Sequence, residues 1–137
     1  VCGVQEECDC RCVPVRPGIY ATEVNIHNHL DREVKIEKHV VPVVFAGAAA
    51  GREPRFGRPR ASDKIVLPPH SATMDDCCRL ADLLLGAHSD SALPITIGVL
   101  EIISRYPLSM TAVYTVTDAK SGSVSMDVEQ ILGRRTR

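Results

Sequence analysis

The sequence contains no tryptophan, and its aromatic side chains for stacking are three tyrosines and two phenylalanines. Surfaces that bind single-stranded nucleic acid stack successive bases on aromatic side chains, so this composition argues against such a surface. The formal net charge of −1 removes the overall electrostatic argument for binding nucleic acid or an anionic membrane. The longest strongly apolar run, residues 40–50, is interrupted by Pro42 and Gly47 and is far shorter than the roughly 20 residues of a membrane-spanning helix.

Motifs of several enzyme classes are also missing. There is no Gly-x-Ser-x-Gly nucleophile elbow, and the arginine-rich segment 51–60 lacks the Lys-Ser/Thr pair of a phosphate-binding loop. The five histidines are scattered, with no His-x-x-x-His pair that a helix would bring to one face. His27 and His29 alternate where the first predicted strand runs into a polar turn, and a polar outward face explains this pair more simply than a metal or acid–base site. We therefore expect no enzymatic activity.

The sequence does supply an ordinary globular core. Its 137 residues are 45% apolar and 24% charged, which fits one domain that buries roughly two thirds of its unfolded surface. Alternating apolar and polar residues predict strands, and a leucine-rich segment that ends at Gly86 predicts one short helix. The predicted strands span residues 19–28, 33–45, 64–67, 71–77, 95–104, 108–117 and 124–130, and the helix spans 78–85. Because strands and helices do not alternate, we expect an all-β fold, a two-layer antiparallel β-sandwich of about seven strands.

Two of these strands carry more specific expectations. In the last strand, Val124, Met126 and Val128 alternate with polar residues and are predicted to point inward. In the second strand, Pro42 lacks a backbone donor, so residues 40–45 are predicted to lie at a sheet edge or a bulge. An edge there would offer a place for strand pairing between subunits.

The six cysteines are the most unusual feature of the composition. Four lie in the first twelve residues and two are adjacent near the predicted helix: Cys2, Cys8, Cys10, Cys12, Cys77 and Cys78. A domain with a full core does not need this clustering. Two explanations compete, namely disulfide bonds in an oxidising compartment and thiolates that bind a metal.

The disulfide interpretation pairs one of the first four cysteines with Cys77 or Cys78, within one chain or between neighbouring chains. A bond from Cys12 to Cys77 within one chain would close about 65 residues and stabilise the fold by roughly 4 kcal/mol. In the metal interpretation, Cys8, Cys10 and Cys12 share one face of an extended segment and bind zinc or copper(I) together with Cys77 or Cys78. Their spacing is not the Cys-x2-Cys of structural zinc sites, so we favour disulfides and expect no cofactor.

Residues 1–18 are predicted to form a cysteine-rich arm, because Pro14 and Pro17 interrupt regular structure near its end. The sandwich domain is then expected to span residues 19–132, followed by a basic tail over 133–137. Twelve extended residues reach roughly 40 Å, which exceeds the radius of about 14 Å expected for such a domain, so the arm can touch a neighbouring subunit. The cysteines, and a first residue that is valine rather than methionine, predict an exported protein located outside the cell or on its surface.

Charged side chains gather in two segments. Four arginines lie in the predicted loop between the second and third strands: Arg52, Arg55, Arg58 and Arg60. Asp75 and Asp76 lie just before the predicted helix. A solvated loop explains the arginines most simply. The more specific alternative is that they bind acidic residues of a neighbouring subunit. A head-to-tail match of this kind would build rings or open filaments.

Three segments resemble a known group of sequences. Residues 20–28 (YATEVNIHN), 112–115 (AVYT) and 128–131 (VEQI) resemble uncharacterised small bacterial β-sandwich proteins. This resemblance covers most of residues 20–132 and implies a fold rather than a reaction. A cysteine-bearing arm before one sandwich also resembles, in layout only, the subunits of disulfide-linked bacterial surface and spore appendages.

These observations predict a non-enzymatic structural subunit that self-assembles into an extracellular homopolymer, such as a filament. The arm cysteines are expected to dock on neighbouring subunits or to crosslink them. The protein itself is the expected partner, with no nucleic acid and no membrane span. The alternative is a small secreted binding module that holds a metal through the thiolates of the arm.

Overall fold

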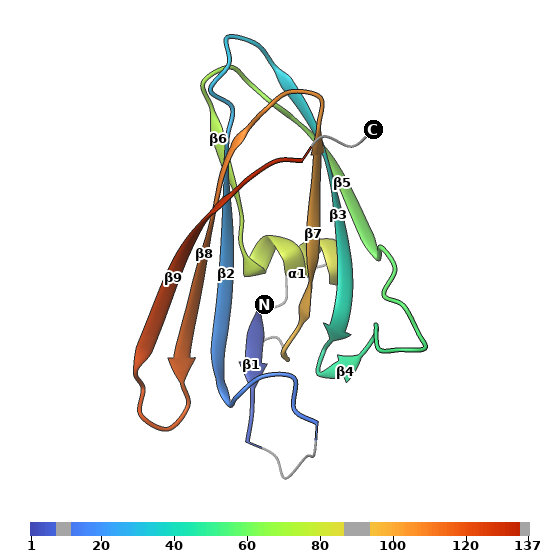
Figure 1. The fold of residues 1–137 in the computed structure, drawn as a ribbon, viewed down its shortest axis with the longest axis vertical. Helices are drawn as coiled ribbons and strands as arrows, with labels where there is room; N and C mark the ends of the chain where they lie inside the picture. The colour runs from blue at the N-terminus through green and yellow to red at the C-terminus, as the bar shows by residue number, and fades with distance from the viewer. Residues whose placement is uncertain (8–11, 87–93, 135–137) are drawn as a thin grey trace.

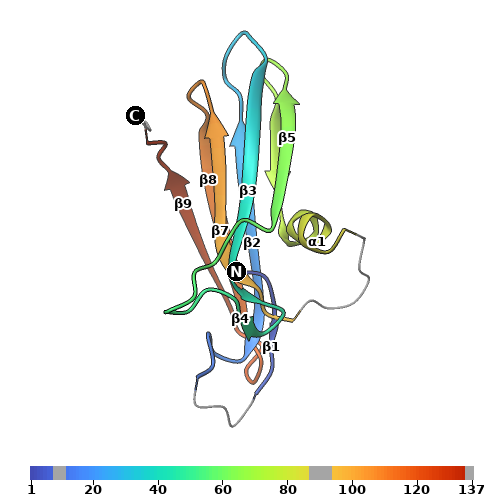
Figure 2. The same cartoon turned by 90° about the vertical axis from the view of Figure 1, so that its right-hand side faces the viewer.

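The computed structural model describes residues 1–7, 12–86 and 94–134 and shows two β-sheets packed together (Figures 1 and 2). The described residues form nine strands and one helix. In chain order these are β1 (Gly3–Gln5), β2 (Gly18–His27), β3 (Val34–Phe45), β4 (Ala48–Ala49), β5 (Ala61–Leu67), β6 (Ala72–Asp75), α1 (Cys77–Leu85), β7 (Ile97–Ser104), β8 (Ser109–Asp118) and β9 (Val124–Ile131). The all-β sandwich with one short helix is therefore confirmed.

The first sheet is built around β2. This strand pairs with β8 over its whole length, and β8 pairs in turn with β9, so that β9 lies at the end of the sheet. On the other side of β2, β1 pairs with its first residues and β6 with its last. Residues 3–5 thus belong to the sheet of their own molecule, although the sequence suggested that they form part of a separate arm.

The second sheet is built around β3, which lies between β5 and β7. The short strand β4 pairs with Val44 and Phe45, and the backbone N–H groups of Ala50 and Gly51 donate to the Val43 carbonyl. Residues 40–45 therefore have neighbours on both sides, and the expectation that they offer a free edge is wrong. The expected bulge is present, because the register with β7 shifts just after Pro42.

The core lies between the sheets. Because side chains alternate along a strand, one row from each of four strands points inward. These side chains pack into a single buried cluster, which consists of Val24, Ile26, Val34, Ile36, Leu67 and Ala112. Full burial of one such aliphatic side chain contributes roughly 1.5–3 kcal/mol. The inward row of β3 continues from Ile36 to Lys38, which is also buried. The sandwich therefore contains a lysine in its apolar interior.

The helix α1 lies at one side of the sandwich (Figure 2). Asp76 caps its first turn, because its side chain accepts a hydrogen bond from the backbone N–H of Arg79 at 2.7 Å. Gly86 ends the helix in the left-handed conformation, with φ of 72°, as the sequence predicts. In the described part of the chain, no helix is long and apolar enough to cross a membrane.

Candidate functional site

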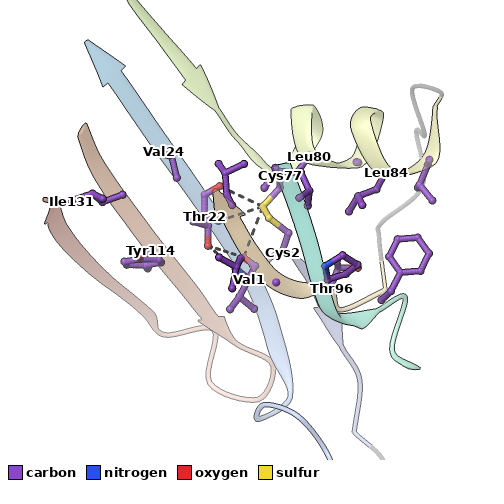
Figure 3. Close-up of a pocket in the computed structure, with 18 residues that line it drawn as sticks. Val1, Cys2, Thr22, Val24, Cys77, Leu80, Leu84, Thr96, Tyr114 and Ile131 are labelled. Atoms are coloured by element: carbon purple, nitrogen blue, oxygen red, sulfur yellow. Dashed lines mark hydrogen bonds between the residues drawn. A yellow bond between two sulfur atoms is a disulfide. The ribbon is translucent and has the colours of Figure 1, made fainter. Parts of the chain in front are cut away.

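Cys2 and Cys77 form a disulfide bond within the chain. Their Cα atoms are 5.5 Å apart, and 75 positions separate them in the sequence. Cys2 is buried and exchanges backbone hydrogen bonds with Thr96, at 2.9 and 2.8 Å, in the segment that leads into β7. The bond thus ties the start of β1 to the first residue of α1 (Figure 3). The sequence predicted a bond between one of the first four cysteines and Cys77 or Cys78, and the structure confirms such a bond within one chain.

The remaining cysteines divide into two groups. Cys12 and Cys78 are free and exposed, whereas Cys8 and Cys10 lie outside the described residues. The disulfide removes Cys77 from the proposed set of metal-binding thiolates. Within residues 1–7, 12–86 and 94–134, no group of three or more histidine, cysteine, aspartate or glutamate side chains is arranged to hold a metal ion.

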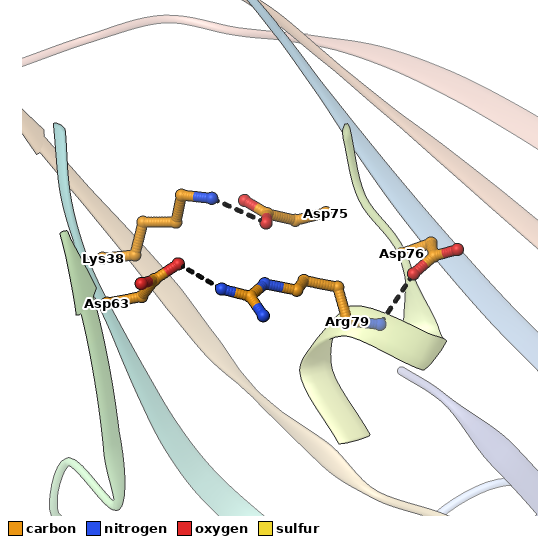
Figure 4. Close-up of polar contacts among 5 residues, drawn as sticks. All are labelled: Lys38, Asp63, Asp75, Asp76 and Arg79. Atoms are coloured by element: carbon orange, nitrogen blue, oxygen red, sulfur yellow. Dashed lines mark hydrogen bonds and ion pairs between the residues drawn. The ribbon is translucent and has the colours of Figure 1, made fainter. Parts of the chain in front are cut away.

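Asp75 was expected from the sequence to contact a neighbouring subunit, and the structure shows that this is wrong. Its side chain is 1% exposed, and Oδ1 lies 2.7 Å from Nζ of Lys38, which is 3% exposed (Figure 4). This ion pair links β3 in one sheet to β6 in the other. An aspartate in the interior is tolerated because the lysine neutralises it, so the position of Lys38 in the inward row explains why Asp75 cannot face a partner.

A second ion pair lies beside the first but is partly open to solvent. Arg79 of α1 donates to Asp63 of β5 at 2.6 Å (Figure 4). This hydrogen bond is the main reason that the pKa of Arg79 is raised, and the negative charges of Asp63 and Asp75 add to it. The two pairs together connect α1 and both sheets.

The arginines of the predicted basic segment are exposed. Arg52, Arg55 and Arg58 lie in the connection between β4 and β5, and Arg60 lies at its end, just before β5. The Arg60 guanidinium is placed over the ring of Phe45, 4.3 Å from its centre. Arg60 is thus already engaged within the molecule, and the other three arginines remain on its surface.

β9 is exposed on both of its faces. Its apolar side chains Val124, Met126 and Val128 have exposed fractions of 69%, 67% and 56%. The register with β8 places Ile131 beside Met110, and both pack against the core. The alternate residues of β9 therefore face away from the core, and the prediction that Val124, Met126 and Val128 point inward is wrong.

The unequal widths of the sheets explain this exposure. The first sheet is four strands wide, since β1 and β6 share one side of β2, whereas the second is three strands wide. β9 is the end strand of the wider sheet, so neither of its faces is covered. Ile19 of β2 lies on the same outer face and is also exposed. Thr117 of β8 pairs with Ile19 on one side and with Val124 on the other, so the three residues lie in one row across the sheet. We call Ile19, Val124, Met126 and Val128 together the β9 surface.

The other face of β9 carries exposed acidic side chains. Asp127 and Glu129 alternate with the apolar residues, on the side where Tyr114 of β8 lies. The Tyr114 hydroxyl donates to Oε2 of Glu129 at 3.4 Å. Burial is the main cause that raises the pKa of Tyr114, and the negative charges of Glu129 and Asp127 raise it further. β9 thus presents an apolar face, an acidic face and one edge that pairs with no strand among the described residues.

An apolar pocket of about 200 Å³ lies between the sheets, next to the disulfide bond (Figure 3). Its walls come from both sheets and from α1, and they include Val24, Tyr114, Val40, Leu100, Leu80 and Leu84. No local pattern in the sequence indicated this pocket, because its walls come from segments far apart in the chain.

No protein-family model, curated protein or solved structure matches this chain.

Proposed function

We propose that this protein is a structural subunit that self-assembles into an extracellular homopolymer, in which β9 of one molecule packs against the arginine-bearing side of the next. The observation that carries this proposal is the exposure of β9 on both faces and along one edge. Exposed strand edges pair readily with other chains, and soluble proteins usually cover or blunt them. β9 contains no lysine or proline, and its charged side chains are Asp127 and Glu129, which oppositely charged groups on a partner can neutralise.

The β9 surface supplies an energetic reason for association. Burial of one exposed aliphatic side chain contributes roughly 1.5–3 kcal/mol. The burial of three or four such side chains therefore contributes a free energy of the same order as the cost of bringing two molecules together, about 4–15 kcal/mol. Ile19, Val124, Met126 and Val128 provide this number within one face of the first sheet.

The charges favour a head-to-tail arrangement over a symmetric one. Two copies of β9 paired in antiparallel fashion about Val128 would place Asp127 of one copy opposite Glu129 of the other, and like charges in that position are destabilising. The exposed arginines of the connection between β4 and β5 are the complementary surface. Figure 1 shows that connection and β9 on opposite sides of the molecule, so each molecule can bind one neighbour with each side. Such heterologous contacts form rings or open filaments.

Covalent links between subunits would run through the exposed thiols. Cys12 and Cys78 are free and exposed, whereas Cys2 and Cys77 are bonded to each other. An oxidising environment outside the cell, which the cysteine content suggests, would allow the exposed thiols to bond. The association through β9 does not depend on these links.

A triple lysine variant tests the role of the β9 surface. We expect Val124→Lys, Met126→Lys and Val128→Lys together to convert assemblies into monomers, because three ammonium groups on one face resist burial. Light scattering coupled to size-exclusion chromatography measures the mass, and circular dichroism checks that the strands remain. All three positions are exposed, so the fold should tolerate the change.

The second sheet offers a matched control for this experiment. Val66, Val99 and Ile103 are also exposed apolar strand residues, with β5 and β7 as their strands. Their replacement by lysine adds the same charge to the opposite sheet. We expect this control to assemble as the unmodified protein does. Loss of assembly in the control alone, or monomers in the unmodified protein, would show that β9 is not the contact.

Charge reversal tests the head-to-tail arrangement separately. We expect Asp127→Lys with Glu129→Lys to weaken association at least about tenfold, since about 1.4 kcal/mol of lost attraction has that effect. The reversal Arg52→Glu with Arg55→Glu should weaken it similarly. An equal mixture of the two variants should assemble again, because the acidic β9 of one variant matches the unchanged arginines of the other and the introduced lysines match the introduced glutamates, and sedimentation velocity detects this assembly. Restored assembly of either variant alone at low salt would contradict the arrangement.

A further inference from the structure

The pocket between the sheets has no role in the proposed assembly, and its construction points to a binding site. Protein interiors contain few voids larger than a water molecule. This pocket has a volume of about 200 Å³, which exceeds the engineered cavity of about 150 Å³ that binds benzene in another protein. A space of this size next to a packed core is large enough for one aromatic ring or a short alkyl chain.

The walls of the pocket are held in place by strong local connections. The disulfide bond fixes Cys77, and the Thr22 backbone N–H donates to Sγ of Cys77 at 3.3 Å (Figure 3). Leu80 and Leu84 are four residues apart on α1, so their side chains lie on one side of the helix and form one wall. The disulfide therefore fixes the wall that Cys2 and the start of α1 form.

The walls offer no partner to a cationic ligand. Among the described residues no acidic or basic side chain lines the pocket, and the charged group at its walls is the α-amino group of Val1, which donates to Oγ1 of Thr22 at 3.0 Å. A cation that entered the pocket would lose its hydration and would meet this amino group rather than a carboxylate. The apolar side chains come from both sheets and from α1, so a ligand would be surrounded by hydrocarbon.

The hydroxyl groups at the walls already have partners inside the protein. Oγ1 of Thr22 donates to the Val1 carbonyl at 2.8 Å, and Oγ1 of Thr96 accepts from the Ala46 N–H at 3.2 Å. The Tyr114 hydroxyl donates to Glu129. These side chains therefore offer little to a polar ligand.

We propose that the pocket beside the Cys2–Cys77 disulfide binds a small uncharged apolar molecule, with about the size of one aromatic ring or a short alkyl chain. The volume, the wall fixed by the disulfide and the apolar lining, in which no described residue contributes an acidic or basic side chain, carry this inference. The site is complete within one molecule, so binding does not require assembly.

A titration with two ligands of equal chain length tests the charge preference. We use 1-hexanol and hexylammonium at neutral pH, and record the amide NMR spectrum of the isotope-labelled full chain. Saturable shifts with hexanol are expected at residues 22, 80, 84 and 114, with hexylammonium binding at least about tenfold more weakly because its ammonium group must be desolvated and meets no carboxylate among the described lining residues. Equal or tighter binding of hexylammonium, or no saturable shifts with hexanol, would overturn the proposal.

Two variants locate the site. Leu84→Trp fills the pocket from α1 and should abolish the saturable shifts, with Leu84→Phe as a smaller replacement if the first variant fails to fold. Met74→Trp adds the same indole at an exposed position of β6, outside the pocket lining, and should bind hexanol as before. Unchanged binding in the folded Leu84 variants would place hexanol elsewhere and refute the site. The titration is repeated on the triple lysine variant of β9, which separates failure of this proposal from failure of the assembly.

Discussion

The Asp75→Ala variant is expected to lose about 3–5 kcal/mol of stability, because it leaves the buried Lys38 ammonium without its partner. The total stability of a small domain is about 5–15 kcal/mol, so this change removes a large part of it. Both side chains are almost fully buried and 2.7 Å apart. Urea denaturation followed by circular dichroism measures the change as a lower midpoint.

A double variant and a control distinguish this pair from an ordinary ion pair. Lys38→Met with Asp75→Ala removes both charges and should recover most of the loss, since a buried pair replaced by apolar groups is often neutral in stability. Asp63→Ala breaks the neighbouring pair with the partly exposed Arg79, and should cost no more than about 1 kcal/mol. If Asp75→Ala and Asp63→Ala lower the midpoint equally, the buried pair does not contribute more to the free energy of unfolding than the partly exposed pair does.

Removal of the disulfide bond is the second large effect. Cys2→Ala with Cys77→Ala is expected to destabilise the fold by about 4 kcal/mol, the chain-entropy value for a loop with a sequence separation of 75. Amide hydrogen exchange should also increase first in β1 and in the first turn of α1, which the bond holds together. The denaturation midpoint and the exchange rates measure these two effects.

The free cysteines provide the control for this measurement. Cys12→Ser with Cys78→Ser removes two exposed thiols that take no part in the bond. This variant should keep the midpoint of the unmodified protein, and addition of a reductant should lower the midpoint of both to the value of the Cys2 and Cys77 variant. A reductant that leaves the midpoint unchanged would contradict the expected contribution of the bond.

The seven longer strands were predictable because each depends on a local alternation that is visible in the sequence, whereas the short strands β1 and β4 were not predicted. The cap of α1 at Gly86 was predictable for a similar reason, since glycine readily adopts the left-handed conformation. The orientation of β9 was not predictable from alternation alone. The register with β8 decides which face of β9 points toward the core, and the width of the opposite sheet decides whether that face is covered. A local pattern contains neither.

The candidate site was predictable only in part. The clustering of cysteines indicated a bond to Cys77 or Cys78, but the choice of Cys2 depends on the pairing of β1 with β2, a contact between distant residues. Lys38 occupies an inward position of β3, and its charge argues for the surface when the sequence is read alone. The alternation of β3 places it inward, and its charge is tolerated there because Asp75 approaches from the other sheet, a contact between distant residues.

The position of the disulfide bond has a mechanical consequence for a subunit under tension. When force acts between the first residue and the far end of the chain, the load passes directly from Cys2 to Cys77 through the sulfur atoms. The segment between them, which contains β2, β3, β5 and β6, stays off the load path. The loop that the bond closes therefore cannot be extended while the disulfide is intact.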